Sequence, residues 1–378
     1  MILYDMMKKT FKANSKLLRQ GGFGCIFFPS IECSGKVNTK KNFATKVQAT
    51  SFNTINEINI GKMILKIPNY SFYFVPILKS CPVKLKTIET SERELAKCKS
   101  INAHFQREEA NEKENENEKS FILMTMNYIT NKPFERIFSI ATPSKKQTMV
   151  QLIDTFNVLL DAIGLLLKNN IVHLDLKGEN ILYNTKLHSV QIIDFGLSIF
   201  IPKLTRQNLN NYFYVYSPDY YVWPFEVHVI NFLIHIMAGG NETILTREEI
   251  VKIVEDIVKK NNLLKIFNAS FISMYVDVGV AFLTNFVGQT KSTVISELVK
   301  GYTTWDNYSL SVLYLGLLTD IFPDGLPDHS FINKFYKMLI HNILPDFSKR
   351  YTIEETKSVF KDIFFSEDTI QEYINLIR

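Results

Sequence analysis

Short runs of alternating hydrophobic and polar residues dominate the first third of the chain. Glycine, proline and polar residues bound these runs, which is typical of strands separated by turns. We therefore predict strands at residues 16–19, 25–29, 42–49, 72–78, 83–88 and 121–126. A longer period at residues 55–66, followed by Pro68, predicts one helix among them.

Beyond residue 129 the apolar residues recur three and four positions apart, which is the period of a helix. We predict helices at residues 150–168, 248–260, 270–286, 310–322, 331–344 and 353–364, and an apolar strand at 190–193. A strand-rich front and a helix-rich rear predict an α+β chain. It would have a small strand-rich domain at residues 1–127 and a larger helical domain at residues 128–378.

Residues 107–119 consist almost entirely of Glu, Asn and Lys. Such a segment cannot bury enough apolar surface to offset the entropy of ordering it. We predict a disordered acidic insert there. An acidic docking segment is the alternative interpretation.

Composition narrows the choice of partners. The chain has 43 basic and 38 acidic residues, and this balance with its scattered lysines does not indicate nucleic acid binding. The most membrane-like run, residues 271–287, is interrupted by Asp277, so a buried helix is expected there rather than a membrane span. The N-terminus lacks the apolar core of a signal peptide. We expect a cytoplasmic protein.

The cysteines support the same expectation. No two of them form a CxxC pair, so the spacing indicates neither a zinc site nor a disulfide framework, and a reducing compartment is expected. They are Cys25, Cys33, Cys81 and Cys98.

Two motifs carry the chemistry. Residues 173–180 read H-x-D-x-K-x-x-N, and residues 194–196 read D-F-G after the apolar strand. Together they supply a candidate base, a cation and two oxygen ligands for a metal. Phosphoryl transfer needs a positioned hydroxyl and cations on the phosphate oxygens, with little covalent help from the protein. The alternative is a surface loop with a fortuitous string.

The order and spacing of these motifs resemble the catalytic and magnesium loops of protein kinases. The resemblance implies a two-lobed kinase fold with a small antiparallel sheet in the front lobe and a larger helical rear lobe. It also implies ATP and Mg²⁺ (or Mn²⁺) as cofactors and proteins as substrates. Asp175 would accept the proton of the substrate hydroxyl, and Lys177 would neutralise the transferred phosphate. Asn180 and Asp194 would hold the metal, while His173 would fix the loop.

The front of the chain resembles the nucleotide site of the same family. A glycine loop is expected at Gly21, Gly22, Phe23, Gly24 and Ile26, although Arg19 stands in the place of the first glycine. A plain glycine-rich hairpin is the alternative.

The strand at residues 43–47 resembles the V-A-I-K strand, with Lys46 as the nucleotide lysine and Glu57 as its partner on the next helix. A solvent-facing strand lysine is the alternative. Met126, Asn127 and Tyr128 resemble the hinge that contacts adenine, or else form an ordinary strand end.

Three further residues resemble anchors of the kinase rear lobe. Glu226 lies in a stretch similar to A-P-E, Arg350 would pair with it, and Asp306 would brace the catalytic loop. A long helical insertion at residues 228–304 separates Glu226 from Asp306, and its role cannot be read from the residues.

More narrowly, residues 21–33 and 220–227 are similar to the serine/threonine kinases of large cytoplasmic DNA viruses, which would place the protein in host cytoplasm or virion. Lys177 favours serine/threonine substrates. Leu174 replaces the arginine that grips a phosphorylated residue in related enzymes, so we expect activity without that phosphorylation. The alternatives are a pseudokinase or scaffold that binds protein partners, and a small-molecule or lipid kinase. The sequence indicates neither the protein substrate nor the oligomeric state.

Overall fold

A computed structural model describes residues 15–21, 24–38, 40–85, 88, 92–103, 121–138, 145–326 and 331–365. The chain divides into two compact units. The first contains Met1–Tyr70 and Val75–Thr130, and the second contains Ser71–Phe74 and Asn131–Arg378. The predicted acidic insert at residues 107–119 lies outside the described residues.

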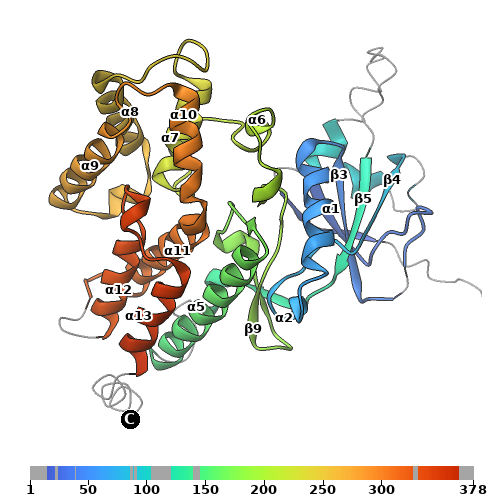
Figure 1. Ribbon diagram of the computed structural model, residues 1–378. Helices are drawn as coiled ribbons and strands as arrows, with labels where there is room; N and C mark the ends of the chain where they lie inside the picture. The colour runs from blue at the N-terminus through green and yellow to red at the C-terminus, as the bar shows by residue number, and fades with distance from the viewer. Residues whose placement is uncertain are drawn as a thin grey trace, which may run out of the picture. The chain divides into compact units, whose positions relative to one another are not determined.

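The first unit is built on a five-stranded antiparallel sheet with strand order β1-β2-β3-β5-β4 (Figure 1). The strands are β1 (Lys16–Gln20), β2 (Gly24–Phe28), β3 (Phe43–Ala49), β4 (Lys79–Val83) and β5 (Phe121–Asn127). Helix α1 (Phe52–Ile64) begins three residues before the predicted start, because the Ser51 hydroxyl caps it by accepting a hydrogen bond from Thr54 N.

The predicted strands at residues 72–78 and 83–88 are wrong. Residues Tyr70–Tyr73 form the short helix α2, and the edge strand β4 ends at Val83. The apolar run predicts a strand, but Phe74 and Val75 are buried residues that follow α2, at 1% and 5% exposure. The short helix α3 (Glu92–Ala96) lies in a stretch for which no element is predicted.

The two faces of the sheet are covered differently. On one face, Ile58 of α1 packs with Ile77, Ile122 and Met124. On the other face, residues of β2, β3 and β5 pack against the chain that follows β4, including Leu85, Leu95 and Ile101. The described residues between β4 and β5 therefore form a second cover for the sheet.

One disulfide fastens this second cover to the sheet and another joins the loop after β2 to β4, so the prediction that the cysteines form no disulfide framework is wrong. Cys25 of β2 bonds Cys98 after α3, and Cys33 bonds Cys81 of β4. The partners are 73 and 48 residues apart in sequence, and only the sheet brings their Cα atoms to 6.0 and 5.9 Å. Because such bonds persist in oxidising surroundings, the expectation of a reducing compartment loses its basis in the cysteines.

The second unit is mostly helical. Its longer helices are α5 (Lys145–Lys168), α7 (Phe225–His235), α8 (Arg247–Lys260), α9 (Ala269–Thr284), α10 (Lys291–Val299), α11 (Trp305–Ile321), α12 (Phe331–Asn342) and α13 (Ile353–Phe365). Among its described residues, β7 (Ile171–Val172) pairs with β10 (Ile199–Phe200). A three-stranded sheet has the order β6 (Asn131–Pro133), β8 (Ile181–Asn184) and β9 (Ser189–Ile192). The predicted α+β architecture, a small antiparallel sheet followed by a larger helical part, is confirmed.

The helices depart from the prediction in three ways. No element is predicted over helix α10, although Val294, Ile295 and Leu298 form its buried face. Helices α5 and α11 begin five residues before their predicted starts. Helix α7 was not predicted as an element because its residues from Phe225 to Leu233 are all buried. A helix surrounded by protein has no polar face, so its sequence shows no amphipathic period.

Within the described residues, one helical stretch, Thr148–Lys168, is long and apolar enough to cross a bilayer by length and composition. Half of that stretch is buried inside the protein, and its inward side chains include Phe156, Leu160 and Ile163 at 0% exposure. Helix α9 occupies the run for which a buried helix is expected, but it buries only one face, which carries Tyr275, Gly279, Phe282 and Leu283.

Candidate active site

The loop between β7 and β8 carries the H-x-D-x-K-x-x-N motif, and a buried carboxylate shapes it. Asp306, at the start of α11, accepts hydrogen bonds from His173 N at 2.7 Å and from Leu174 N at 3.0 Å. Leu174 has a left-handed backbone (φ 59°), which a leucine rarely adopts without such support. Burial raises the pKa of Asp306, and His173 and the two N–H groups act in the opposite direction.

Asp175 lies at the centre of a cluster of polar groups. Asn180 Nδ2 donates to Asp175 Oδ2 at 2.8 Å and to the Asp175 carbonyl at 2.9 Å. Lys177 Nζ lies 3.1 Å from Asp175 Oδ1. Tyr220 donates its hydroxyl proton to the same oxygen. The structure therefore brings together three residues of the predicted site and adds a fourth.

His173 has a supporting position. Its Nδ1 accepts a hydrogen bond from Asp175 N at 3.2 Å, so the proton of a neutral ring is on Nε2, which lies 3.1 Å from the Ile193 carbonyl. The ring fixes the base in the loop and links the loop to the strand before Asp194.

Asp194 follows β9 and is half-buried, with φ at 61°. Its Oδ1 accepts from Gly196 N at 3.5 Å, at the long end of the hydrogen-bond range. The next residue, Phe195, is buried. Its ring centroid lies 5.1 Å from that of His173 and 6.1 Å from that of Phe74, both edge-on. The turn is thus anchored by an aromatic side chain while the carboxylate stays partly accessible.

Tyr220 is the site residue that the sequence did not reveal. Lys177 Nζ donates to the Tyr220 hydroxyl at 2.7 Å and lies 5.1 Å from the ring centroid, and the ring contacts Trp223 edge-on at 5.0 Å. Burial, and then the charge of Asp175, raise the pKa of Tyr220 far above its usual value, so the hydroxyl keeps its proton. Tyr220 stands in a stretch rich in tyrosine, and no spacing distinguishes it from its neighbours.

In the first unit, the predicted lysine and glutamate form an ion pair. Lys46 Nζ donates to Glu57 Oε2 at 2.8 Å, and the side chains are 8% and 4% exposed. Within the sheet Lys46 lies between Ile26 of β2 and Met124 of β5. The alternative of a solvent-facing strand lysine is therefore wrong.

The glycine loop is described only at its ends, since Gly22 and Phe23 lie outside the described residues. Gly21 N donates to the Gly24 carbonyl at 2.9 Å and closes a tight turn. A Cβ on Gly24 would lie 2.6 Å from the Val47 carbonyl, so this position needs a glycine to let β2 approach β3. This packing role explains Gly24 without reference to a phosphate.

The predicted hinge residues continue β5. Met126 packs against the cluster of Ile58 and Ile77, and Asn127 pairs with Phe43. Tyr128 stacks its ring on Phe28 with centroids 3.9 Å apart. Tyr128 N donates to the Asn42 carbonyl at 2.9 Å, so this amide is not free to bond an adenine edge.

The candidate metal ligands suit a hard cation that is shared with a substrate. Within the described residues, no group of three or more His, Cys, Asp or Glu side chains could hold a metal alone. Magnesium is commonly bound by one or two carboxylates together with substrate phosphates. Asn180 donates from its nitrogen to Asp175, which leaves its amide oxygen for a cation. Asn180 and Asp194 therefore supply the kind of oxygen donors that would hold a divalent cation, which would bring positive charge to the substrate phosphates.

The predicted anchor pair is present. Arg350 Nη1 and Nη2 donate to the two carboxylate oxygens of Glu226 at 2.8 and 2.7 Å, and both side chains are fully buried. Trp305 Nε1 donates to the same carboxylate at 2.9 Å. Because Trp305 precedes Asp306, this contact ties the anchor to the helix that braces the catalytic loop.

Residues 83–222 match the family model of the protein kinase domain. The matched stretch includes β5, the catalytic loop, Asp194 and Tyr220. No curated protein matches the chain. The match and the architecture, an antiparallel sheet followed by a mostly helical part, support placement in the protein kinase superfamily. They support phosphoryl transfer by a protein kinase, with the use of ATP and a divalent metal that the domain generally implies.

Proposed function

We propose that this protein is a serine/threonine protein kinase that uses ATP and Mg²⁺ and acts without phosphorylation of the segment at residues 197–222. The observation that carries the proposal is the cluster around Asp175, in which Lys177 and Asn180 contact the carboxylate of a loop held by Asp306. A positioned base beside a cation is what transfer to a hydroxyl requires.

Each residue has a defined task in this proposal. Asp175 takes the proton of the substrate hydroxyl as its oxygen attacks the γ-phosphorus, and ADP leaves. Lys177 neutralises charge on the transferred group, and Lys46, held by Glu57, contacts the α- and β-phosphates. Mg²⁺, bound by Asn180 and Asp194, would supply positive charge to the phosphate oxygens.

Two features support the finer parts of the proposal. Lys177, two residues after the base, supports serine/threonine acceptors. Leu174 is 2% exposed and belongs to an apolar cluster with Phe213 and Trp223. At this position the catalytic loop therefore contacts the segment at residues 197–222 through apolar packing and not through an ion pair. Phosphatase treatment should therefore leave the rate unchanged, and a collapse of the rate would refute this part.

Incubation with labelled ATP, Mg²⁺ and generic protein substrates tests the activity. Asp175→Asn should abolish transfer, because the amide cannot accept the proton while its shape is retained. The matched control is Asp320→Asn, which makes the same charge change at an exposed position in the last turn of α11. Equal transfer by Asp175→Asn and the wild type would refute the proposal, and acid hydrolysis of the labelled substrate identifies the acceptor residue.

A pseudokinase is the second candidate, favoured by Arg19 in place of the first glycine and by Leu174. It predicts a folded protein that transfers no phosphate. A thermal shift with ATP and Mg²⁺ reports nucleotide binding independently of transfer. A small-molecule kinase is less consistent with the buried Glu226–Arg350 pair, which resembles the protein kinase rear lobe.

A further inference from the structure

The segment at residues 197–222 is held by side chains at several points along its length. The His235 ring nitrogen Nε2 lies 2.7 Å from the Phe213 carbonyl, and Ser309 Oγ donates to the Val222 carbonyl at 2.8 Å. Just beyond the segment, Trp223 Nε1 donates to the Leu174 carbonyl at 3.0 Å. These contacts order both sides of Tyr220, the residue that bonds the base.

The middle of the segment is held by helix α8, which belongs to the insertion. Tyr216 donates its hydroxyl to Asp256 Oδ2 at 2.6 Å, and Lys260 Nζ lies 2.8 Å from the same carboxylate. Lys260 is also 5.7 Å from the Tyr216 ring, which packs edge-on against Phe232 at 5.3 Å. Burial, and then Asp256, raise the pKa of Tyr216, so its hydroxyl remains a donor.

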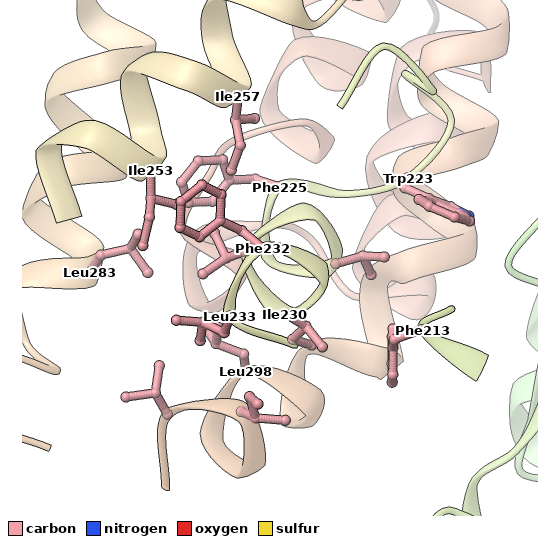
Figure 2. Packing of buried hydrophobic residues seen from close by; sticks show 14 of the residues in the cluster. Phe213, Trp223, Phe225, Ile230, Phe232, Leu233, Ile253, Ile257, Leu283 and Leu298 are labelled. Atoms are coloured by element: carbon pink, nitrogen blue, oxygen red, sulfur yellow. The ribbon is translucent and has the colours of Figure 1, made fainter. Parts of the chain in front are cut away.

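Helix α8 is capped at its start and packs against α7. Thr246 and Glu249 form a capping box at its start, and Lys259 and Lys260 lie in its last turn. Its apolar face includes Ile253 and Ile257, which lie close to Phe225 and Phe232 of α7 (Figure 2). Asp256 therefore projects from a helix that is fixed to α7 through its apolar face.

A second contact comes from the residues just after α8. Asn262 Nδ2 donates to the Asp219 carbonyl at 3.4 Å, next to Tyr220. The two contacts hold the stretch that ends at Tyr220 from one side, while Tyr220 itself reaches Asp175. The insertion thus contacts the segment close to Tyr220, the residue that bonds Asp175.

We infer that helix α8 is a built-in clamp for the segment, with Asp256 as a positioning residue that orders it through Tyr216. This inference rests on the proposed function and deepens it. Related enzymes order the equivalent segment by pairing a phosphate with an arginine. Here Leu174 occupies the arginine position, and a carboxylate from the insertion, bonded to a tyrosine hydroxyl, supplies the ordering without any modification.

Two variants test the clamp. Tyr216→Phe keeps the ring and its packing on Phe232 but removes the donor, and Asp256→Ala removes the acceptor. Each should lower kcat for protein substrates by roughly tenfold, the scale of one hydrogen bond to a charged group that is partly exposed, while the KM for ATP is unchanged. Hydrogen exchange in residues 213–222 should accelerate. The double variant should be no slower than either single variant, since both break the same bond.

Two further variants serve as controls for the test. Asp256→Asn keeps an acceptor oxygen and should retain most of the rate, which a loss of folding would not explain. Glu255→Ala removes an exposed acid from the same helix and should behave as wild type. Wild-type exchange and rate in both single variants would overturn the clamp. If the wild type itself transfers no phosphate, the proposed function fails, and faster exchange in the variants still identifies the contact.

Discussion

Each unit of the protein contains a buried ion pair, and the two pairs differ in how firmly they are held. In the first unit, the Lys46–Glu57 pair joins β3 to α1 and retains 8% and 4% exposure. In the second unit, the Glu226–Arg350 pair is bidentate and fully buried, and Arg350 also donates from Nε to the Leu344 carbonyl at 2.6 Å. Its guanidinium lies 5.0 Å from the Tyr308 ring centroid.

This difference in burial and bonding indicates that the first ion pair serves phosphate binding and the second serves the stability of the fold. An ammonium has three donors, so Lys46 can bond a phosphate while Glu57 still holds it. A planar guanidinium whose donors are already used holds elements that are far apart in sequence. We therefore expect the first pair to matter most for phosphoryl transfer and the second for the stability of the fold.

The largest loss of stability should come from Arg350→Met. It leaves the Glu226 carboxylate buried without its partner, which typically costs about 3–5 kcal/mol. Both tryptophans, Trp223 and Trp305, are in the second unit, so their fluorescence during urea unfolding reports this unit. Lys349→Met is the control, because that side chain is 65% exposed. A change within about 0.5 kcal/mol for Arg350→Met would contradict the anchor role.

Reduction of the two disulfides should weaken the first unit alone, since all four cysteines lie there. The bonds close long loops in the unfolded chain, and loss of such a constraint costs about 2–4 kcal/mol. Hydrogen exchange in β2, β3 and β5 should accelerate after reduction while the tryptophan transition stays in place. An equal effect on both units would show that the disulfides do more than hold the cover of the sheet.

Lys46→Met should separate activity from fold. Phosphoryl transfer should fall by about 10² or more, the scale for loss of one preorganised charge. The tryptophan transition of the second unit should not move. Lys62→Met, an exposed lysine on α1, is the matched control. Near-normal transfer by Lys46→Met would remove the nucleotide role from this pair.

The smallest expected effect is a pH dependence in the second unit. Burial lowers the pKa of His228 to about 4 in the folded protein, against the opposing influence of Asp219. Between pH 6.5 and 4 the unfolded chain binds a proton that the folded chain does not, so stability falls as the pH falls through this window. The loss from pH 7 to 5.5 should be about 1 kcal/mol. His228→Leu should remove this part of the pH dependence, and an unchanged slope would contradict the assignment.

Local sequence determined much of the candidate site. The catalytic loop and the D-F-G turn are contiguous strings, so the spacing of Asp175, Lys177 and Asn180 could be read directly. The Lys46–Glu57 pair was also accessible, because a strand and the helix that follows it are close in sequence. Helix α8 could be predicted because one of its faces is buried and the other is exposed. Strand β3 could be predicted as a short apolar run between polar turns, although both of its faces are buried.

Tertiary structure decided the rest, because it depends on residues that are distant in sequence. The disulfide partners, the contact of Tyr220 with Asp175 and that of Tyr216 with Asp256 join positions 40 to 73 residues apart. Helix α7 lost its periodic signal because it is buried on all sides. A hydrophobic pattern records which residues avoid water but not which residues they meet. The sequence therefore determined the reacting groups, and the folded chain determined how they are held.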